Sequence, residues 1–311
     1  MKSRDIVQAI GHTPMVELER MSPKPSVRIF GKLEGANPTG SLKDRIAKFM
    51  IEKAEAEGKL TKDRTILEAT SGNTGIALAM LARRKGYRMK VVVPENVGAE
   101  RVELLRAFGV EVVFSPGGHG TNGSIRMAQK MLSEDEGYFM PYQYGNPNNP
   151  LAHYETTGPE ILKDLPKVDV FIAGLGTGGT LMGVSRRLKE KNPATKVIAV
   201  VPHPGENIQG LRSLEDGFIP PIVDINLLDG RVVITNMDAF RGTRELLDVE
   251  GIFAGVSSGA VVQCAKRMAR RMEKGNIVLL LADGGWKYLS TGLWTKDEAA
   301  LAQNADGQVW W

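Results

Sequence analysis

The sequence predicts an α/β fold made of two three-layer domains, each built on a mostly parallel sheet. Short, mostly apolar runs alternate with helix-period segments along the whole chain. This alternation is typical of parallel strands that helices cover on both faces. Glycine- and serine-rich segments follow several of the apolar runs, at the strand ends where such sheets bind ligands. We therefore expect the binding residues in loops that lead from strands into helices.

The apolar runs are the expected strands, and the periodic segments between them are the expected helices. Strands are expected at residues 27–33, 65–69, 89–93, 111–114, 168–173, 197–201 and 277–281. Helices are expected at residues 44–57, 73–85, 99–108, 124–133, 153–165, 179–191 and 257–274. No repeat or low-complexity segment interrupts this order.

The Pro- and Asn-rich segment at residues 145–150 is the best candidate for a crossing between domains. We expect a smaller, mobile N-terminal domain at residues 44–148, which carries a substrate-binding loop. A larger domain is expected at residues 149–311, with residues 1–43 packing on it. The active site is then expected in the cleft between the two domains.

Composition restricts the classes of function. The 311 residues are 42% hydrophobic and 24% charged, as in proteins that bury a sizeable core. A net charge of +4 favours small anionic ligands and is too weak to indicate nucleic-acid binding. The N-terminus lacks the apolar core of a signal peptide, and no run of about 18 apolar residues predicts a membrane span. We expect a cytoplasmic enzyme with no membrane or nucleic-acid partner.

Cysteine and histidine usage argues against disulfide and metal chemistry. Cys264 is the only cysteine and lies in a helix-like segment, so we expect a small buried residue rather than a nucleophile. The four histidines are dispersed and show no metal-ligand spacing. We assign structural or surface roles to His12, His119, His153 and His203 and expect no metal centre.

The first segment with chemical meaning is Asn37-Pro38-Thr39-Gly40-Ser41-Leu42-Lys43-Asp44-Arg45, which joins an expected strand to an expected helix. A lysine at such a junction presents its amine to a cleft, and a desolvated amine forms a Schiff base with an aldehyde. Taken alone, Lys43 would be an exposed lysine in the first turn of a helix. The surrounding nine residues favour the catalytic interpretation.

A second segment, Glu-Ala-Thr-Ser-Gly-Asn-Thr-Gly at residues 68–75, lies where the strand at 65–69 ends and a helix begins. Its hydroxyl groups and free backbone N–H donors suit a carboxylate. An ordinary helix N-cap explains this segment equally well when it is considered by itself.

A third segment, Gly-Leu-Gly-Thr-Gly-Gly-Thr at residues 174–180, offers many N–H groups at a helix N-terminus and predicts a phosphate site. It also matches G-x-G-x-x-G, but the next strand ends in Pro202-His203-Pro204 without the acid that a dinucleotide ribose needs. We therefore expect phosphate binding and no NAD. A fourth segment, Gly-Val-Ser-Ser-Gly-Ala at residues 255–260, is by itself only a serine N-cap.

In this order and spacing, the four segments resemble the fold-type II family of pyridoxal-phosphate (PLP) enzymes, and within it the cysteine synthases. The resemblance runs from Gly11-His12-Thr13-Pro14 to at least residues 288–291. N-P-T-G-S-x-K-D-R and T-S-G-N-T-G are its most specific motifs. It implies PLP as cofactor and cysteine biosynthesis by β-replacement on a serine derivative, through an aminoacrylate intermediate.

The resemblance also implies a role for each matching residue. Lys43 is expected to carry the cofactor as a Schiff base and to move the α-proton. Asn73 would bond the cofactor's 3′-oxygen, and Ser257 would face the ring nitrogen, where a neutral hydroxyl favours β-elimination. The residues expected at the cofactor phosphate are Gly176, Thr177, Gly178, Gly179 and Thr180. Those expected at the substrate carboxylate are Thr70, Ser71, Gly72, Thr74 and Gln143.

The segment at residues 208–218 bears on the choice of substrate. Acetylserine enzymes carry a small, glycine-rich stretch after I-Q-G, whereas Arg212 stands near this position here. A guanidinium suits a phosphate dianion better than an acetyl ester, so Arg212 indicates O-phosphoserine. A salt bridge from Arg212 to Glu215 or Asp216 is the plain alternative.

Residues 251–255, 283–292 and 307–311 also resemble the O-phosphoserine sulfhydrylase branch of cysteine synthase B. In that branch the sulfur donor can be a small carrier protein with a thiocarboxylated C-terminus, as an alternative to sulfide. The tail ending Val309-Trp310-Trp311 is explained equally well by folding back into the cleft and by anchoring an interface.

Four alternatives stay open at this point. The first is a synthase specific for O-acetylserine. Cystathionine β-synthase is disfavoured because no cysteine near the N-terminus is available to ligate haem, and serine or threonine dehydratases usually lack T-S-G-N-T-G. An inactive regulatory homologue would have lost the lysine or the phosphate loop. The resemblance further implies a homodimer, and a complex with serine acetyltransferase is compatible with the sequence.

Overall fold

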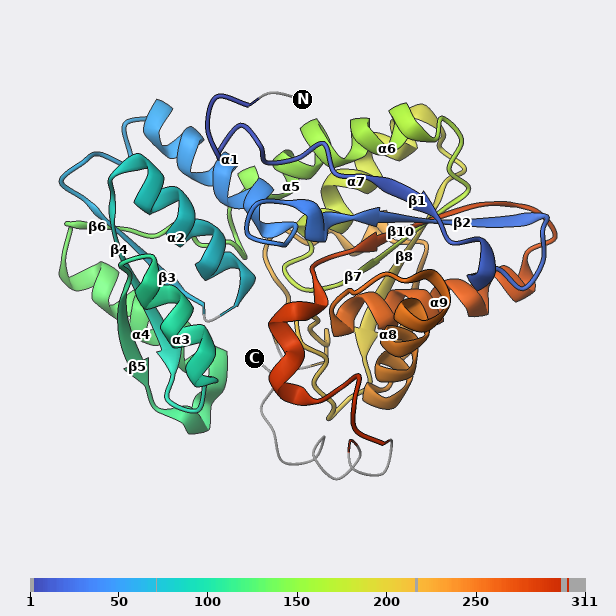
Figure 1. The fold of residues 1–311 in the computed structure, drawn as a ribbon. Coiled ribbons are helices and arrows are strands. Elements are labelled where there is room, and N and C mark those ends of the chain that lie inside the picture. The colour runs from blue at the N-terminus through green and yellow to red at the C-terminus, as the bar shows by residue number, and fades with distance from the viewer. Residues whose placement is uncertain (1–2, 71, 216–217, 298–300, 302–311) are drawn as a thin grey trace. The chain divides into compact units, whose positions relative to one another are not determined.

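The computed structural model describes residues 3–70, 72–215, 218–297 and 301 (Figure 1). Within these residues the chain forms two compact units. Unit 1 contains the described residues up to Ile10 and residues 43–149, and unit 2 contains residues 11–42 together with the described residues from Pro150 onward. Each unit is built on its own mostly parallel sheet, so the predicted α/β class is confirmed.

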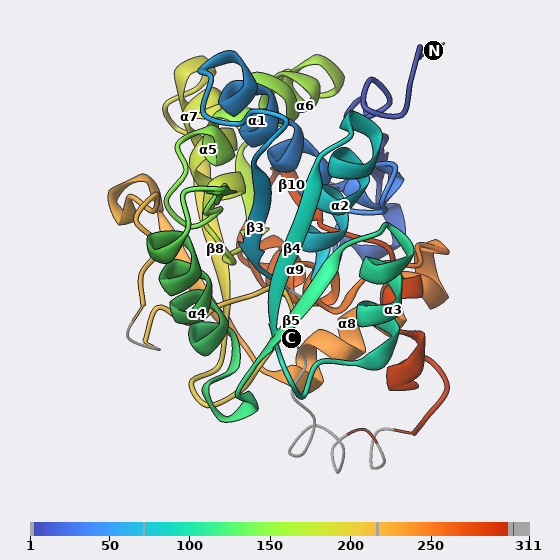
Figure 2. The same cartoon turned by 90° about the vertical axis from the view of Figure 1, so that its left-hand side faces the viewer.

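Unit 1 has a four-stranded parallel sheet in the order β5-β4-β3-β6. Its strands are β3 (Thr65–Ala69), β4 (Arg88–Pro94), β5 (Glu111–Ser115) and β6 (Tyr138–Phe139). Its helices are α1 (Lys43–Ala56), α2 (Asn73–Lys85), α3 (Ala99–Ala107) and α4 (Gly120–Glu134). Figure 2 shows α4 on one face of this sheet and α2 and α3 on the opposite face.

Burial explains why these strands lie in the middle of unit 1. Val91, Val92 and Val93 of β4 are all fully buried, as expected for a parallel strand that helices cover on both sides. The apolar side chains of Val7 and Ile10 pack into the same hydrophobic cluster. The segment before Lys43 therefore divides: its first residues belong to unit 1 and residues 11–42 to unit 2.

Unit 2 has a six-stranded sheet in the order β1-β2-β10-β7-β8-β9, in which only the edge strand β1 runs antiparallel to its neighbour. The strands are β1 (Met15–Glu17), β2 (Val27–Leu33), β7 (Val170–Gly174), β8 (Lys196–Pro202), β9 (Gly230–Ile234) and β10 (Gly275–Leu281). The helices are α6 (Gly158–Asp164), α7 (Gly179–Lys191), α8 (Asn236–Glu250) and α9 (Val256–Arg271). In Figure 1, α6 and α7 lie on one face of the sheet and α8 and α9 on the other.

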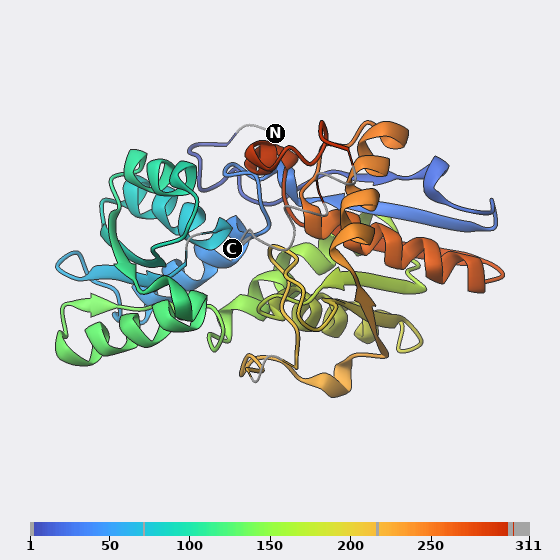
Figure 3. The same cartoon turned by 90° about the horizontal axis from the view of Figure 1, so that it is seen from below.

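Helices α8 and α9 pack closely together (Figure 3). Gly242 of α8 and Gly259 of α9 make this approach possible. A Cβ atom on Gly259 would lie 2.1 Å from the Ala239 carbonyl oxygen, and one on Gly242 would lie 2.3 Å from the Gly259 carbonyl oxygen. Only glycine allows two helix backbones to come this close. Cys264 is buried in the core beside them, as predicted, and burial raises the pKa of its thiol to about 12.

The observed elements differ from the prediction in two ways. The helix expected at residues 153–165 is a chain of three parts, namely α5 (Asn148–Ala152), one turn of π-helix (His153–Thr157) and α6. Helix α8 and the strands β1, β6 and β9 were missed. Signals for α8 were present, since Thr235 caps its first turn by accepting from the N–H of Asp238, a recognised N-cap pattern.

None of the helices within the described part of the chain is long and apolar enough to span a membrane. Three sequence features lie outside the described residues: Ser71, Asp216 and the C-terminal tail at residues 307–311.

Candidate active site

Lys43 is the first residue of α1, and its side chain is half-buried. The turn before it is closed by a hydrogen bond from the Gly40 N–H to the Asn37 carbonyl, 2.7 Å long. Leu42 is tied to unit 2 because its N–H donates to the Ala282 carbonyl at 2.9 Å. The lysine therefore follows directly on a segment that is fixed to the end of β10.

The residues after β10 also reach the helix that carries Ser257. The Gly284 N–H donates to the Gly40 carbonyl at 3.2 Å, and the Gly255 N–H donates to the Asp283 carbonyl at 3.0 Å. Gly255 is the N-cap residue of α9. One two-residue connection, Asp283-Gly284, is thus bonded both to the turn before Lys43 and to the start of α9.

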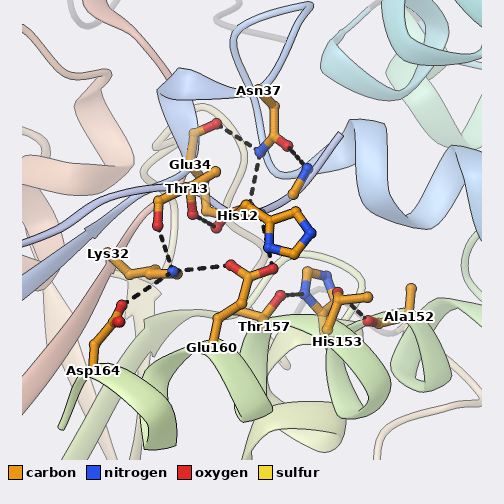
Figure 4. A network of polar contacts seen from close by, with 12 residues as sticks. His12, Thr13, Lys32, Glu34, Asn37, Ala152, His153, Thr157, Glu160 and Asp164 are labelled. Atoms are coloured by element: carbon orange, nitrogen blue, oxygen red, sulfur yellow. Dashed lines mark hydrogen bonds and ion pairs between the residues drawn. The ribbon is translucent and has the colours of Figure 1, made fainter. Parts of the chain in front are cut away.

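A buried polar network holds Asn37, the first residue of the lysine motif (Figure 4). Its side-chain amide donates to Glu34 Oε2 at 2.9 Å, and the hydroxyl of Thr13 donates to Glu34 Oε1 at 2.7 Å. Lys32, only 1% exposed, donates to the Thr13 carbonyl at 2.6 Å and pairs with Glu160 at 2.9 Å. Buried charges are tolerated when each has partners, so this network fixes the position of the motif.

The glycine-rich segment at residues 174–180, which is predicted to bind phosphate and is called the phosphate loop below, runs from the last residue of β7 into the first turn of α7. Gly178 is the N-cap residue of α7, and the Gly179 N–H donates to the Thr177 hydroxyl at 3.4 Å; N–H groups at the start of a helix favour an anion. A Cβ atom on Gly176 would lie 2.6 Å from the Gly210 carbonyl oxygen. Thr177 and Thr180 are both buried. These residues form a narrow cradle lined by N–H groups and hydroxyls, which fits a phosphate group.

His153 contacts this loop from the π-helical turn. Its Nε2 atom lies 3.2 Å from the Thr180 hydroxyl. Its Nδ1 atom lies 2.9 Å from the Thr157 hydroxyl (Figure 4). The imidazole is fully buried. π-Helical turns occur frequently at functional sites. The sequence placed His153 among structural or surface residues, and its contact with the loop depends on chain segments that are 27 residues apart.

Ser257 is the second residue of α9 and is 7% exposed. The N-cap residue of this helix is Gly255, so the interpretation of Ser257 as an ordinary cap is wrong. A Cβ atom on Gly210 would lie 3.9 Å from the Ser257 hydroxyl, while the Gly210 carbonyl faces Gly176. The structure thus brings the phosphate loop, Gly210 and Ser257 into one neighbourhood within unit 2.

The second segment opens α2 with Gly72 as the N-cap residue, so the hydroxyls of Thr70 and Thr74 are not used as the cap. The Gly72 N–H donates to the Thr70 hydroxyl at 3.4 Å. Asn73 is the half-buried first residue of α2. The hydroxyl of Thr74 donates to Gln143 Oε1 at 2.7 Å. Two predicted carboxylate-binding residues, distant in sequence, therefore touch each other.

Arg212 lies beside the phosphate loop of unit 2. Its backbone N–H donates to the Leu175 carbonyl at 2.7 Å, and its guanidinium carbon lies 5.0 Å from the centre of the Phe218 ring. Glu215, one of the two acids considered as a partner for Arg212, lies 3.8 Å from Arg231.

Glu68 is a buried acid to which the sequence assigned no role. It belongs to β3, next to the loop that leads into α2, and is 1% exposed. Burial raises the pKa of its carboxyl to about 7, although N–H groups of Ala69, Gln143 and Tyr142 act in the opposite direction. The available signal was an acid inside an otherwise apolar strand, directly before a loop.

No cluster of three or more His, Cys, Asp or Glu side chains suited to a metal ion occurs among the described residues.

Comparison with known proteins agrees with the resemblance seen in the sequence motifs. The family described as "Pyridoxal-phosphate dependent enzyme" matches residues 6–283. A cysteine synthase from Staphylococcus aureus is 42% identical over 304 residues, which cover 94% of this chain and 98% of that protein.

Two solved structures are similar over nearly the whole chain. A hydrogen sulfide-producing enzyme from Fusobacterium nucleatum is 42% identical with a TM-score of 0.87, covering 92% of this chain and 100% of that one. A cysteine synthase from Entamoeba histolytica is 35% identical with a TM-score of 0.90, covering 99% and 97%. With the fold, the lysine motif and the phosphate loop in place, this chain belongs to the cysteine synthase family of fold-type II, PLP-dependent enzymes.

Proposed function

We propose that this enzyme makes L-cysteine by β-replacement on O-phosphoserine, with O-acetylserine as the alternative substrate. The observation that carries this choice is the position of Arg212. Its backbone is bonded to Leu175, the residue that precedes Gly176 of the phosphate loop. The guanidinium, whose carbon lies 5.0 Å from the centre of the Phe218 ring, is a permanently charged, forked donor, and such a donor suits a doubly charged phosphate ester.

The residues present fit PLP. The cradle at Gly176–Thr180 has the N–H groups and hydroxyls for its phosphate, and Lys43 offers an amine at the start of a helix. When bound, PLP withdraws electrons from the α-carbon of an amino acid, which acidifies the α-proton and allows the β-substituent to leave.

Within this proposal, Lys43 would hold the cofactor covalently, and its ε-amino group would move the α-proton. Asn73 would bond the 3′-oxygen of the cofactor, and the hydroxyl of Ser257 would bond the ring nitrogen. Ser257 would offer a neutral hydroxyl there in place of a carboxylate, which would favour loss of the β-group.

The substrate carboxylate is bound by Thr70, Ser71, Gly72, Thr74 and Gln143. The contact between Thr74 and Gln143 supports these roles. Since Thr74 occupies the Oε1 atom of Gln143, the Nε2 amino group is the part of that amide suited to donate to a carboxylate.

Steady-state kinetics of Arg212→Ala test the substrate. We expect kcat/KM for O-phosphoserine to fall by roughly 30- to 150-fold, equivalent to about 2–3 kcal/mol for a lost charge-assisted contact. The value for O-acetylserine should change by less than about threefold, since an acetyl ester carries no charge for the guanidinium to bind.

Arg231→Ala is the matched control, because it removes an arginine from the same unit that pairs with Glu215 at 3.8 Å. This variant should leave kcat/KM for both substrates unchanged. Equal losses on both substrates for Arg212→Ala would remove O-phosphoserine from the proposal and leave the O-acetylserine reaction. Pyruvate formed without any cysteine, in the presence of sulfide, would identify a dehydratase instead.

We further propose a cytoplasmic homodimer that accepts sulfide or a thiocarboxylated carrier protein as the sulfur donor. Light scattering would give the oligomeric state. Cysteine formation measured with sulfide and with a thiocarboxylated carrier, at equal concentration, would identify the preferred donor.

A further inference from the structure

The phosphate loop has three alternating positions without room for a side chain, namely Gly174, Gly176 and Gly178. A Cβ atom on the first would lie 2.2 Å from the Cδ2 atom of Leu211. One on the second would lie 2.6 Å from the Gly210 carbonyl oxygen, and one on the third 2.2 Å from the Cγ2 atom of Val223. All three contacts come from one stretch of unit 2, residues 208–215 and 218–224, which we name the covering segment. The covering segment therefore packs directly on the backbone of the phosphate loop.

The covering segment is held near both of its ends. At its start, Ile208 is 2% exposed within the core of unit 2, and the Leu211 N–H donates to its carbonyl at 2.9 Å. At its end, the Asp224 N–H donates to the Sδ atom of Met182 in α7 at 3.2 Å. The segment is thus attached both to the core and to the helix that follows the phosphate loop.

Leu211 and Arg212 contact two consecutive residues at the start of the phosphate loop. The Leu211 side chain occupies the space beside Gly174. The Arg212 N–H donates to the carbonyl of Leu175, the next residue, at 2.7 Å. The guanidinium carbon of Arg212 lies 5.0 Å from the centre of the Phe218 ring. Because Leu211 sets the backbone from which the Arg212 side chain starts, a shift of Leu211 would shift the guanidinium as well.

Space for Leu211, and not backbone conformation, explains the glycine at position 174. Gly174 is the last residue of β7, and its φ does not lie in the left-handed region. A glycine weakens a strand relative to alanine, so the backbone by itself would favour a side chain here. Leu211 is only partly buried where it packs against the apolar core. A leucine that served the core alone would not require a glycine opposite it.

We propose that Leu211 is a positioning residue for substrate choice: by filling the space beside Gly174 it holds the Arg212 backbone on Leu175 and aims the guanidinium, without touching the substrate. The proposal rests on the proposed function for the role of Arg212. Its structural part, the restraint on the Arg212 backbone, is independent of any substrate.

The first experiment measures amide hydrogen exchange of Arg212 by NMR in the full-length holoenzyme. Wild-type protein should protect this amide, because it is bonded to the Leu175 carbonyl. Leu211→Ala should raise its exchange rate about tenfold or more, since the backbone is no longer held at this place. Gly174→Ala should have the same effect, because the added methyl group displaces Leu211. Unchanged exchange in either folded variant would overturn the proposal, whatever reaction the enzyme catalyses.

The second experiment compares kcat/KM for O-phosphoserine and O-acetylserine at saturating PLP. Leu211→Ala should lower the value for O-phosphoserine about tenfold and that for O-acetylserine by less than about threefold. The difference arises because only the phosphate ester depends on a correctly aimed guanidinium. A general loss of stability or of cofactor would lower both values alike, so equal losses would contradict the proposal.

Arg212→Ala, measured alongside, separates this proposal from the proposed function. If Arg212→Ala is selective for O-phosphoserine and Leu211→Ala is not, the positioning role fails and the proposed function stands. If Arg212→Ala lowers both values equally, the proposed function fails, and the role of Leu211 in substrate choice fails with it. The double variant should be no less selective than Arg212→Ala, since Leu211 acts through the guanidinium. A further loss of selectivity would contradict that route.

Gly174→Ala combined with Leu211→Ala tests whether the two residues share one space. The loss of selectivity in this double variant should be smaller than the sum of the two single losses. The reason is that the added methyl group fills part of the space that the leucine side chain leaves. Additive losses would mean that the two positions act independently, against the proposal.

Leu227→Ala is the matched control. Leu227 is a partly buried leucine of the same unit that packs against another hydrophobic cluster, so its truncation should change neither the exchange of the Arg212 amide nor the ratio of the two substrates. A selective loss of O-phosphoserine activity in this control would contradict a specific role for Leu211. If Leu211→Ala does not fold, Gly174→Ala carries both measurements, and wild-type exchange and selectivity in that variant would overturn the proposal.

Discussion

Lys43 illustrates how local context decides the role of a single residue. It begins α1, its side chain is half-buried, and the preceding turn is bonded to the end of β10 and to Gly284. An ordinary surface lysine does not require a preceding turn that is held by hydrogen bonds to another strand end. Its position supports the predicted role as the residue that carries the cofactor.

Lys43→Ala should abolish the visible absorbance that a Schiff base gives the purified enzyme and reduce turnover by at least about 10³-fold. The expectation follows because no other amine takes part in the proposed reaction. Absorbance spectra before and after addition of PLP provide the measurement. Lys48→Ala, a change in the next turn of the same helix, should keep the wild-type spectrum.

His153 shows a residue-scale contact that the sequence did not indicate. Its buried imidazole joins the hydroxyls of Thr180 and Thr157. Removing it leaves the Thr180 hydroxyl without this support at the phosphate cradle. Loss of such a buried hydrogen bond costs about 1–3 kcal/mol.

His153→Ala should therefore weaken PLP binding by roughly 5- to 150-fold, measured by titration of the apoenzyme with PLP. Thr180→Val should have a similar effect, and the double variant should show little additional loss. The exposed His203 gives the control variant, His203→Ala. A full additive loss in the double variant would mean that the histidine does not act through Thr180.

At the scale of elements, the start of α7 is the feature most directly tied to function. The helix begins at Gly179, and the loop before it passes so close to the Gly210 carbonyl that Gly176 has no room for a side chain. A Cβ atom on Gly210 would lie 3.9 Å from the Ser257 hydroxyl, so Gly210 lies near both the loop and Ser257. A side chain at Gly176 would therefore displace either the loop or Gly210.

Gly176→Ala should weaken PLP binding at least about tenfold, because its Cβ would lie 2.6 Å from the Gly210 oxygen and one of the two segments must move. The dissociation constant of PLP for the apoenzyme is the measurement. Gly205→Ala tests an open position, since no atom lies within 4 Å of a Cβ there. Any loss at Gly205 would reflect its positive φ of 81° alone, so a loss as large as that of Gly176→Ala would contradict the steric argument.

At the scale of the whole molecule, buried charge links folding stability to pH. Burial raises the pKa of Glu68 from its ordinary 4.5 to about 7. Folding therefore favours the protonated carboxyl. The folded state gains this stability fully below pH 4.5, where Glu68 is protonated in both the folded and the unfolded chain. The gain is lost as the pH rises to about 7, because the folded protein must then either keep the proton on Glu68 or bury its charge.

Glu68→Gln removes this titration. The stability of the variant relative to wild type should increase by about 2–3 kcal/mol between pH 5 and pH 8. Urea unfolding midpoints of both proteins at the two pH values give the difference. Glu111→Gln, which neutralises an exposed carboxyl, should show a much smaller dependence. If the stability of Glu68→Gln relative to wild type decreased as the pH rose, the pKa of Glu68 would not be raised by folding.

Elements that depend on local sequence could be predicted, and elements that depend on contacts between distant segments could not. The strands at residues 27–33 and 65–69 and the helices at 73–85 and 179–191 were predicted with their observed bounds, because strand and helix periods are local properties. Helix α8 was missed although the Thr235 side chain caps it, since a single N-cap residue is a weak signal by itself. The π-helical turn at residues 153–157 has no local signature, because it depends on packing against α7.

The sequence by itself determined the α/β class, the cofactor and the family, because the lysine motif and the glycine-rich loops express their chemistry within a few neighbouring residues. Only the tertiary structure decided which distant residues support them. It placed His153 against Thr180, Asp283-Gly284 between Gly40 and Gly255, and the Thr74 hydroxyl against the Gln143 side chain. These contacts form only when sheets and helices pack together. The hydrophobic periodicity of a segment shows which of its faces is buried, but it does not show which residue will pack there.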